Sequence, residues 1–226
     1  MCRYANNIYI KGNYKMKKNL IIIGASALAR EVYNYAQEAL SNVNIIGFLD
    51  SRKDILDKYD GYPPIIGVPE LYTPQKNDVF ICALGEPEMR EKYVKMIESR
   101  GGEFITLIHP SAFIGKNVKI DNGTIVSPGA NIACDTTIGK HVYVGIGTNV
   151  CHDCVIGDFV SLSPGCTIAG WCNIGTTCFL GVSCSVIPRI AIGGDSASDS
   201  VYVAAGGVVT KSYKGTRIIG VPAKPK

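Results

Sequence analysis

The sequence predicts a small parallel α/β domain of the Rossmann-like, nucleotide-binding type, followed by a parallel β-helix of hexapeptide repeats. Strand-like and helix-like segments alternate as far as residue 108, and an unbroken six-residue period of aliphatic side chains begins at Ile114. The chain has 226 residues, of which 46% are hydrophobic and 19% charged, enough to build a sizeable core. We place an N-terminal extension at residues 1–17, the α/β domain at 18–108 and the β-helix with a basic tail at 109–226.

The first domain is predicted from four short apolar runs with two helical segments between them. Strands are expected at residues 19–24, 44–50, 78–84 and 104–108, with helices over 25–40 and from Pro87 to the closing Gly101. The first helix should bury Val32, Tyr35, Ala36 and Ala39, and the second should bury Met89, Tyr93, Met96 and Ile97. Alternating strands and helices favour a parallel sheet.

The first strand runs into a loop that resembles a dinucleotide fingerprint only in part. Gly24 is followed by Ala25 and Ser26, and Ala27-Leu28-Ala29 stands where such a loop has further glycines that admit phosphates. This argues against redox use of NAD. The crevice could still hold a nucleotide sugar or serve only packing, and Asp50, at the end of the second strand, is either a ribose contact or a solvated strand end.

The six-residue period identifies the second domain. The aliphatic positions are 114, 120, 126, 132, 138, 144, 150, 156, 162, 168, 174, 180, 186 and 192, and the residue four further on is small or β-branched each time. Three such units would close one triangular coil of 18 residues, with the aliphatic side chains inside and strands stacked at about 4.8 Å. Residues 193–200 form an insertion, and Val203 and Val209 resume the step.

Five of the nine cysteines occupy the small inward position of a hexad: Cys154, Cys166, Cys172, Cys178 and Cys184. Free cysteine is a compact buried residue, so a structural role is favoured. Cys151-x-x-Cys154 could suggest a metal site, but Cys154 should point inward and no second such pair lies at metal-site spacing. We expect no metal and no disulfide.

The repeat places a histidine, carboxylates and a glycine on one edge of the predicted prism. His152 lies at a turn beside Asp153; one coil away, Gly170 stacks over His152 and Asp135 under Asp153. A histidine oriented by a carboxylate, with a free backbone N–H nearby, suits acyl transfer. The alternative is an exposed turn histidine. His141 and His109 are expected to be structural, at a turn and at the domain junction.

Composition and charge indicate which classes of binding partner can be expected. A net charge of +4 does not indicate nucleic-acid binding, and no apolar run is long enough to span or insert into a membrane. The first fifteen residues contain no apolar stretch of signal-peptide length, so a cytoplasmic protein is expected. Five basic and no acidic residues in 211–226 could attract a polyanion such as coenzyme A. One edge of a prism is an open site, so a neighbouring subunit, against which Trp171 could also pack, is expected to complete it.

The chain resembles the NeuD-like and PglD-like sugar acyltransferases, in which a Rossmann-like domain precedes a left-handed β-helix. The resemblance covers residues 18–226. It is carried by Gly24-Ala25-Ser26 with Arg30-Glu31-Val32, Gly47-Phe48-Leu49-Asp50, residues 107–112 (LIHPSA), residues 151–157 (CHDCVIG) and residues 220–224 (GVPAK).

This resemblance implies a function and a set of site residues. It implies a homotrimer with acetyl-coenzyme A between adjacent β-helices, His152 as catalytic base, Asp153 as its partner and Gly170 facing the thioester. Coenzyme contacts would fall on Gly181, Val182, Ala204, Ala205, Gly206 and Lys211, and nucleotide-sugar contacts on Gly24, Ala25, Ser26 and Asp50.

The hypothesis is an acetyl-coenzyme A-dependent acetyltransferase. Its acceptor would be a sugar amine or hydroxyl, above all the 4-amino group of a nucleotide-linked 4-amino-6-deoxyhexose used for surface glycans. The alternatives are an O-acetyltransferase of sialic acid or another sugar, and a non-catalytic trimeric binding or scaffold protein. A zinc hydratase on the same helix fits poorly, because the three histidines are separated by 32 and 11 residues.

Overall fold

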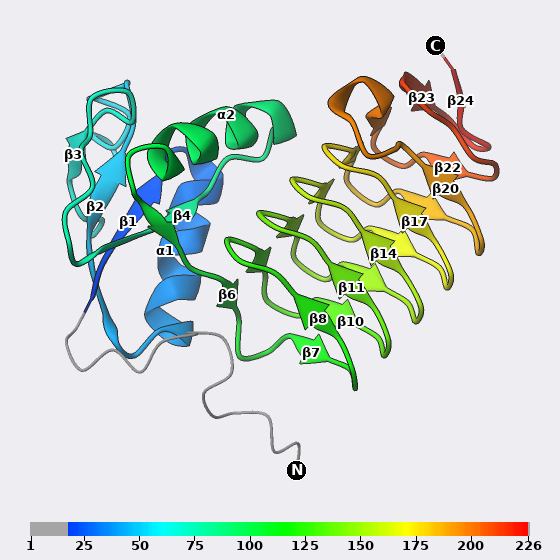
Figure 1. The fold of residues 1–226 in the computed structure, drawn as a ribbon, viewed down its shortest axis with the longest axis horizontal. Helices are drawn as coiled ribbons and strands as arrows, with labels where there is room; N and C mark the ends of the chain where they lie inside the picture. The colour runs from blue at the N-terminus through cyan, green and yellow to red at the C-terminus, as the bar shows by residue number, and fades with distance from the viewer. Residues whose placement is uncertain (1–17, 226) are drawn as a thin grey trace.

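In the computed structural model, which describes residues 18–225, the apolar run of the first strand becomes the centre of a parallel sheet (Figure 1). The sheet has the order β3-β2-β1-β4-β5. Its strands are β1 (Lys18–Ile23), β2 (Val43–Leu49), β3 (Ile65–Gly67), β4 (Asp78–Cys82) and β5 (Glu103–Phe104), with helices α1 (Ala27–Ala39) and α2 (Pro87–Glu98). The extension predicted at residues 1–17 lies outside the described residues.

Two strand predictions for this domain need correction. Strand β3 was not predicted, because it is only three residues long and follows Pro63-Pro64, which is typical of a loop. The strand expected over 104–108 is two strands: β5 pairs with β4, whereas β6 (Leu107–Ile108) pairs with β9 (Ile125–Val126) of the β-helix. A continuous apolar run does not show which sheet each half joins.

The buried face of α2 also differs from the prediction. Ile97 is buried as expected, but the other buried residues are Pro87, Arg90 and Val94, and Met89 is 43% exposed. The predicted buried face was wrong because an apolar periodicity counts only apolar residues and so omits arginine. Arg90 is in fact the largest fully buried side chain among the described residues. In α1 the predicted face holds for Val32, Tyr35 and Ala36, with Ala29 in place of Ala39.

The second part is a parallel β-helix whose coils stack three sheets, which we call faces I, II and III (Figure 1). Face I contains β7 (Phe113–Ile114), β10 (Asn131–Ile132), β13 (Asn149–Val150), β16 (Thr167–Ile168), β19 (Ser185–Val186) and β22 (Val208–Val209). Face II contains β8 (Lys119–Ile120), β11 (Thr137–Ile138), β14 (Val155–Ile156), β17 (Asn173–Ile174) and β20 (Ala191–Ile192). Face III contains β6, β9, β12 (Tyr143–Val144), β15 (Ser161–Leu162), β18 (Phe179–Leu180), β21 (Val201–Val203), β23 (Thr216–Ile219) and β24 (Lys224–Pro225).

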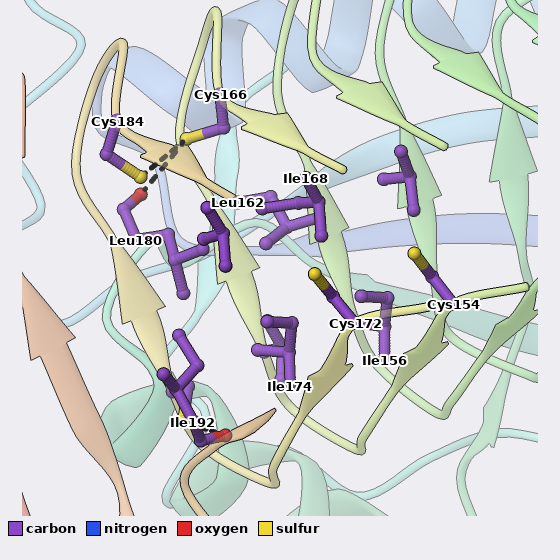
Figure 2. Packing of buried hydrophobic residues seen from close by; sticks show 14 of the residues in the cluster. Cys154, Ile156, Leu162, Cys166, Ile168, Cys172, Ile174, Leu180, Cys184 and Ile192 are labelled. Atoms are coloured by element: carbon purple, nitrogen blue, oxygen red, sulfur yellow. Dashed lines mark hydrogen bonds between the residues drawn. The ribbon is translucent and has the colours of Figure 1, made fainter. Parts of the chain in front are cut away.

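The interior of the prism is filled as the period predicts. Strands 18 residues apart pair in parallel register, for example Asn131 with Asn149, and the aliphatic position of each strand from Val126 to Ile192 is buried. Figure 2 shows four of the inward cysteines, Cys154, Cys166, Cys172 and Cys184, between these aliphatic side chains. All five inward cysteines are buried, and the Cys166 and Cys184 sulfurs lie 3.6 Å apart. Burying one such aliphatic side chain stabilises the fold by about 1.5–3 kcal/mol. The predicted fold class is confirmed.

Each edge of the prism is named here by the histidine that lies on it. The His152 edge joins faces I and II, the His141 edge joins faces II and III, and the His109 edge joins faces III and I. The insertion at 193–200, which contains a short 3₁₀ helix (Ala197–Asp199), lies on the His141 edge between β20 and β21. Within residues 18–225, no helix is both long and apolar enough to cross a membrane.

Arg90 joins the α/β domain to the β-helix. Its Nε donates to the carbonyl of His141 at 2.8 Å, and one terminal nitrogen donates to the carbonyls of Phe159 and Val160 at 2.7 and 3.0 Å. The other donates to the Leu84 carbonyl at 2.5 Å, at the end of β4. Burial lowers the pKa of Arg90 to about 10, so the guanidinium remains charged at neutral pH. The backbone carbonyls that accept its hydrogen bonds stabilise this charge.

His141 is packed into the same interface. Its ring stacks on Phe159 with centroids 5.1 Å apart and meets Phe104 edge-on at 5.0 Å. Burial, followed by the charges of Arg90 and Lys140, lowers the pKa of His141 from 6.5 to about 4. A 3.5 Å contact with Glu98 does not reverse this, because that carboxylate is 49% exposed and screened by water. The expected structural role fits this packing.

The buried His141 predicts acid sensitivity of the fold. The pKa of His141 in the folded state lies below 6.5, so as the pH falls the unfolded chain takes up the proton first. The stability that the neutral His141 contributes is therefore complete above pH 6.5 and is lost progressively towards pH 4. Between about pH 7.5 and 5 the free energy of unfolding should fall by roughly 2 kcal/mol from this group. Thermal melting at a fixed protein concentration measures it. The His141→Asn variant, whose side chain tolerates the left-handed backbone there, should lose this part of the pH dependence; an unchanged dependence would contradict the assignment.

Candidate active site

The His152 edge carries an oriented imidazole. His152 Nδ1 lies 2.8 Å from Asp153 Oδ2, and the two side chains are 43% and 44% exposed. Asp153 has a left-handed backbone (φ 58°), which aspartate adopts readily and which turns its carboxylate back toward its neighbour. With Nδ1–H donating to the carboxylate, Nε2 is the nitrogen left to accept a proton.

Gly170 lies directly over His152, as the repeat predicts. A Cβ on Gly170 would lie 2.7 Å from His152 Cε1 and 2.9 Å from Nε2, so this side of the ring faces the glycine. The Gly170 carbonyl accepts from the Arg189 N–H at 3.1 Å, whereas its own N–H has no acceptor within residues 18–225. A backbone donor beside a proton-accepting nitrogen is the arrangement that an acyl-transfer transition state requires.

We therefore expect Gly170→Ala to impair chemistry without unfolding the chain. Its backbone is in a region that any residue adopts, but the added methyl must displace the His152 ring. Turnover should fall by about 10- to 100-fold, because small misplacements of a catalytic group carry costs of that size. Steady-state kinetics, with the melting temperature and coenzyme affinity measured in parallel, check this; full turnover would show that the ring has room to move.

The coenzyme candidates divide between two edges. Gly181 and Val182 lie on the His109 edge beneath Ala204, Ala205 and Gly206, with the Gly206 N–H donating to the Val182 carbonyl at 2.8 Å. A Cβ on Gly181 would meet the Ala205 nitrogen at 2.6 Å, so only glycine lets these coils approach. Val182 is 50% exposed.

Lys211 belongs to the His152 edge instead. It follows β22, which stacks on β19, and so lies beyond Gly170 and Pro188 on the column of turn residues that contains His152. Three strand spacings amount to about 14 Å, a separation that an extended ligand can bridge. Its ammonium lies 5.4 Å from the Tyr213 ring.

The nucleotide-sugar candidates meet in a cleft at the carboxyl ends of β1, β2 and β4. The cleft has a volume of about 340 Å³ and is lined by three of the four candidates, Gly24, Ser26 and Asp50, together with Ile23, Leu49, Ser51, Arg52, Pro69, Leu84, Gly85, Glu86, Met89 and Tyr93. Ala25 is buried behind it and donates its N–H to Asp50 Oδ2 at 2.9 Å. Ligands of open α/β sheets bind at this end of the strands.

Asp50 is ionised and already partnered. Burial alone would raise the pKa of its carboxyl, but hydrogen bonds from Arg52 and from Ala25 N–H hold it below its usual value. Arg52 donates to both carboxylate oxygens, at 2.9 and 2.8 Å, and is 56% exposed. Arg52 and the cleft residues of α2 were not predicted from the sequence. Their positions in the sequence could have indicated them, because Arg52 lies just after β2 and the other residues lie in the helix that follows β4.

The three histidines and the Cys151/Cys154 pair do not converge. His109 contacts Glu38 of α1 at 3.0 Å, and the three histidines lie on three different edges of the prism. Cys154 is buried in the prism whereas Cys151 is partly exposed, so their thiols do not face a common ion. Among the residues that the structure describes, no three histidine, cysteine or acidic side chains are grouped for a metal.

One chain does not bring all of these candidate residues together. His152, Gly170 and Lys211 lie on one edge, whereas Gly181, Val182 and residues 204–206 lie on another. The acceptor cleft reaches the β-helix near the His141 edge, where the Ser161 hydroxyl donates to the Gly85 carbonyl. Residues on different edges can face one ligand only when two copies pack side by side.

Two protein families match the chain. The PglD N-terminal domain family matches residues 19–97, and the bacterial transferase hexapeptide family (six repeats) matches residues 135–170. A curated relative, the UDP-N-acetylbacillosamine N-acetyltransferase of Bacillus subtilis strain 168, is 32% identical over 115 residues. This match spans 48% of the chain and 50% of the relative, about half of each.

Solved structures with the same architecture cover nearly the whole chain. The acetyltransferase domain of PglB from Neisseria gonorrhoeae has a TM-score of 0.82 and 26% identity, covering 92% of this chain and 100% of that one. PerB from Caulobacter crescentus, solved with CoA and GDP-perosamine, has a TM-score of 0.80 and 30% identity, covering 92% and 97%. Fold, motifs and both family matches agree, and the chain belongs to the PglD-like family of hexapeptide-repeat sugar acyltransferases.

Proposed function

We propose that this protein transfers the acetyl group of acetyl-coenzyme A to the 4-amino group of a nucleotide-linked 4-amino-6-deoxyhexose destined for surface glycans. The observation that carries the proposal is the His152–Asp153 hydrogen bond of 2.8 Å, with Cε1 and Nε2 as the imidazole atoms nearest Gly170. These groups supply a base, its orienting carboxylate and a backbone donor.

The chemistry follows from the free nitrogen of His152. As the amine attacks the thioester carbonyl, Nε2 takes up the proton that the amine loses, and Asp153 stabilises the imidazolium. The Gly170 N–H donates to the oxyanion of the tetrahedral intermediate. Collapse forms the amide and breaks the carbon–sulfur bond, and the imidazolium returns its proton to the departing coenzyme thiolate. No metal takes part in these steps.

The acceptor class is supported by the cleft of the α/β domain. Leu84, Met89 and Tyr93 supply apolar wall, while Asp50 and Arg52 place opposite charges at the end of β2. These groups suit a ligand with a polar nucleotide and a deoxygenated sugar. Two relatives are named as N-acetyltransferases: the Bacillus subtilis protein as a UDP-N-acetylbacillosamine N-acetyltransferase, and the Caulobacter crescentus protein, solved with CoA and GDP-perosamine, as a perosamine N-acetyltransferase.

The working form is proposed to be a homotrimer with three sites between neighbouring β-helices. This arrangement brings the His152 edge of one chain against the coenzyme residues on the His109 edge of the next. It also explains why the apolar side chains of Val155 and Val182 are about half exposed on a single chain.

A thiol-release assay tests the function. Acetyl-coenzyme A is offered with UDP-, dTDP- and GDP-linked 4-amino-6-deoxy sugars, sialic acid and simple amino sugars, and the products are identified by mass spectrometry. Thiol release with one nucleotide-linked amine, forming an amide, is expected. Turnover with a hydroxyl acceptor instead would make the protein an O-acetyltransferase, and absence of coenzyme binding would make it a non-catalytic binding protein; either result overturns the proposal.

A further inference from the structure

We infer that Trp171, held in place by Arg189, is the positioning residue of the catalytic edge. Its indole keeps the His152 imidazole in the orientation that pairs with Asp153 and faces Gly170. This inference rests on the proposed function for its kinetic consequences, but the contact itself can be tested without any substrate.

The need for such a residue arises from the exposure of the dyad. His152 and Asp153 are adjacent residues at a turn, and both are more than two-fifths exposed. A hydrogen bond at an exposed turn competes with water, and each side chain loses rotamer freedom to form it. Neighbouring packing must therefore restrict the imidazole if the 2.8 Å contact is to be populated most of the time.

Trp171 supplies this packing from the coil above. Its ring meets the His152 ring at 89° with centroids 4.5 Å apart, and its backbone N–H donates to the His152 carbonyl at 3.1 Å. The Arg189 guanidinium lies 4.5 Å from the indole centroid, and the Arg189 N–H donates to the Gly170 carbonyl at 3.1 Å. A cation on an aromatic ring and an edge-to-face ring pair are both attractive contacts. Arg189, Trp171 and His152 thus form a continuous stack along the edge.

The backbone of Trp171 has a φ of 58°, in the left-handed region, as at the equivalent positions Asn117, Asp135 and Asp153 of the lower coils. Asparagine and aspartate adopt that region readily. Phe159, another aromatic residue in this region, is packed into the interface between the domains. The indole of Trp171 is instead 50% exposed beside the proposed base, so packing into a core does not account for it.

Kinetics of matched variants test the positioning role. Trp171→Gly should lower kcat by about tenfold or more while both KM values stay within about threefold, and its melting temperature should not fall, because glycine suits the backbone. Trp171→Phe should restore most of the lost turnover. Arg189→Gln should act in the same direction and add little to Trp171→Gly, since coupled residues are not additive. Asn117→Gly, a change to glycine at the equivalent position three coils below, should leave kcat unchanged.

Emission provides a readout that needs no substrate, because Trp171 is the only tryptophan of the chain. The His152 ring meets the indole edge-on at 4.5 Å, so removing that ring should change the emission intensity or maximum of the folded protein. His152→Asn and the wild-type protein should therefore differ in emission at the same pH. Identical emission in the two proteins, or a Trp171→Gly variant with wild-type kcat, would overturn the inference. If no acceptor is acetylated at all, the proposed function fails while the emission result still decides whether the contact exists.

Discussion

Replacing His152 with alanine is expected to lower turnover by about 10²- to 10⁴-fold, the range associated with losing a positioned general base. The imidazole is the group at this edge whose free nitrogen faces Gly170, and its other nitrogen is held by Asp153. Coenzyme affinity should be nearly unchanged, because the proposed coenzyme residues on the His109 edge are untouched. Thiol release and equilibrium binding of acetyl-coenzyme A measure the two quantities separately.

Cys134→Ser is the matched control for this experiment. Cys134 lies one coil below His152 on the same edge, and its thiol is exposed, so it is the alternative nucleophile that the geometry offers. It should keep wild-type turnover. If Cys134→Ser abolishes transfer while His152→Ala retains it, the reaction proceeds through a thioester on the enzyme and the assigned base is wrong.

Replacing Arg90 with alanine should produce the largest loss of stability. The change removes donors from the carbonyls of Leu84, His141 and Phe159 and leaves a cavity between the domains. Several buried acceptors without partners cost about 3–5 kcal/mol together. Leu84 and Gly85 also line the acceptor cleft, so the KM for the acceptor should rise by about tenfold or more in any folded variant while that for the coenzyme stays constant.

Melting temperature and steady-state kinetics check the Arg90 prediction. Arg90→Lys, which keeps the charge but makes fewer hydrogen bonds, should give an intermediate result if the alanine variant does not fold. Arg100→Ala is the control, since Arg100 also donates to three backbone carbonyls but from an exposed position. Equal decreases in melting temperature for Arg90→Ala and Arg100→Ala would contradict the prediction, because burial of the guanidinium would then add nothing to its contribution to stability.

The β-helix could be predicted almost residue by residue because its repeat is local. Each hexad repeats the same backbone, so one register determines which side chains point inward and which residue stacks over which. Cys154 therefore turned inward, and Gly170 lies over His152 as expected. The side-chain hydrogen bond to Asp153 joins neighbours in sequence, so it too was within reach of sequence reasoning.

The parts that could not be predicted depend on contacts between distant segments. Arg90 is buried because carbonyls 51 to 70 residues away accept its hydrogen bonds, and periodicity assigns an arginine to the solvent side of a helix. The division of one apolar run into β5 and β6 likewise depends on their pairing partners. Strand β5 joins the sheet of the α/β domain, whereas β6 joins face III of the β-helix. The pairing of Asp50 with Arg52 joins near neighbours, but the sequence did not show that this carboxylate would already be occupied.

The central claim is that acetyl transfer takes place between the His152 edge of one chain and the coenzyme residues of its neighbour. It is tested by co-expressing His152→Ala with Ala205→Glu, which places an acidic side chain at an exposed position of the proposed coenzyme path. Each variant alone should be inactive. Random mixing in a trimer leaves about a quarter of the interfaces with both edges intact, so the mixture should recover about a quarter of wild-type turnover. Recovery of none, with mixed trimers demonstrated, would show that a single chain supplies both edges and would contradict the account.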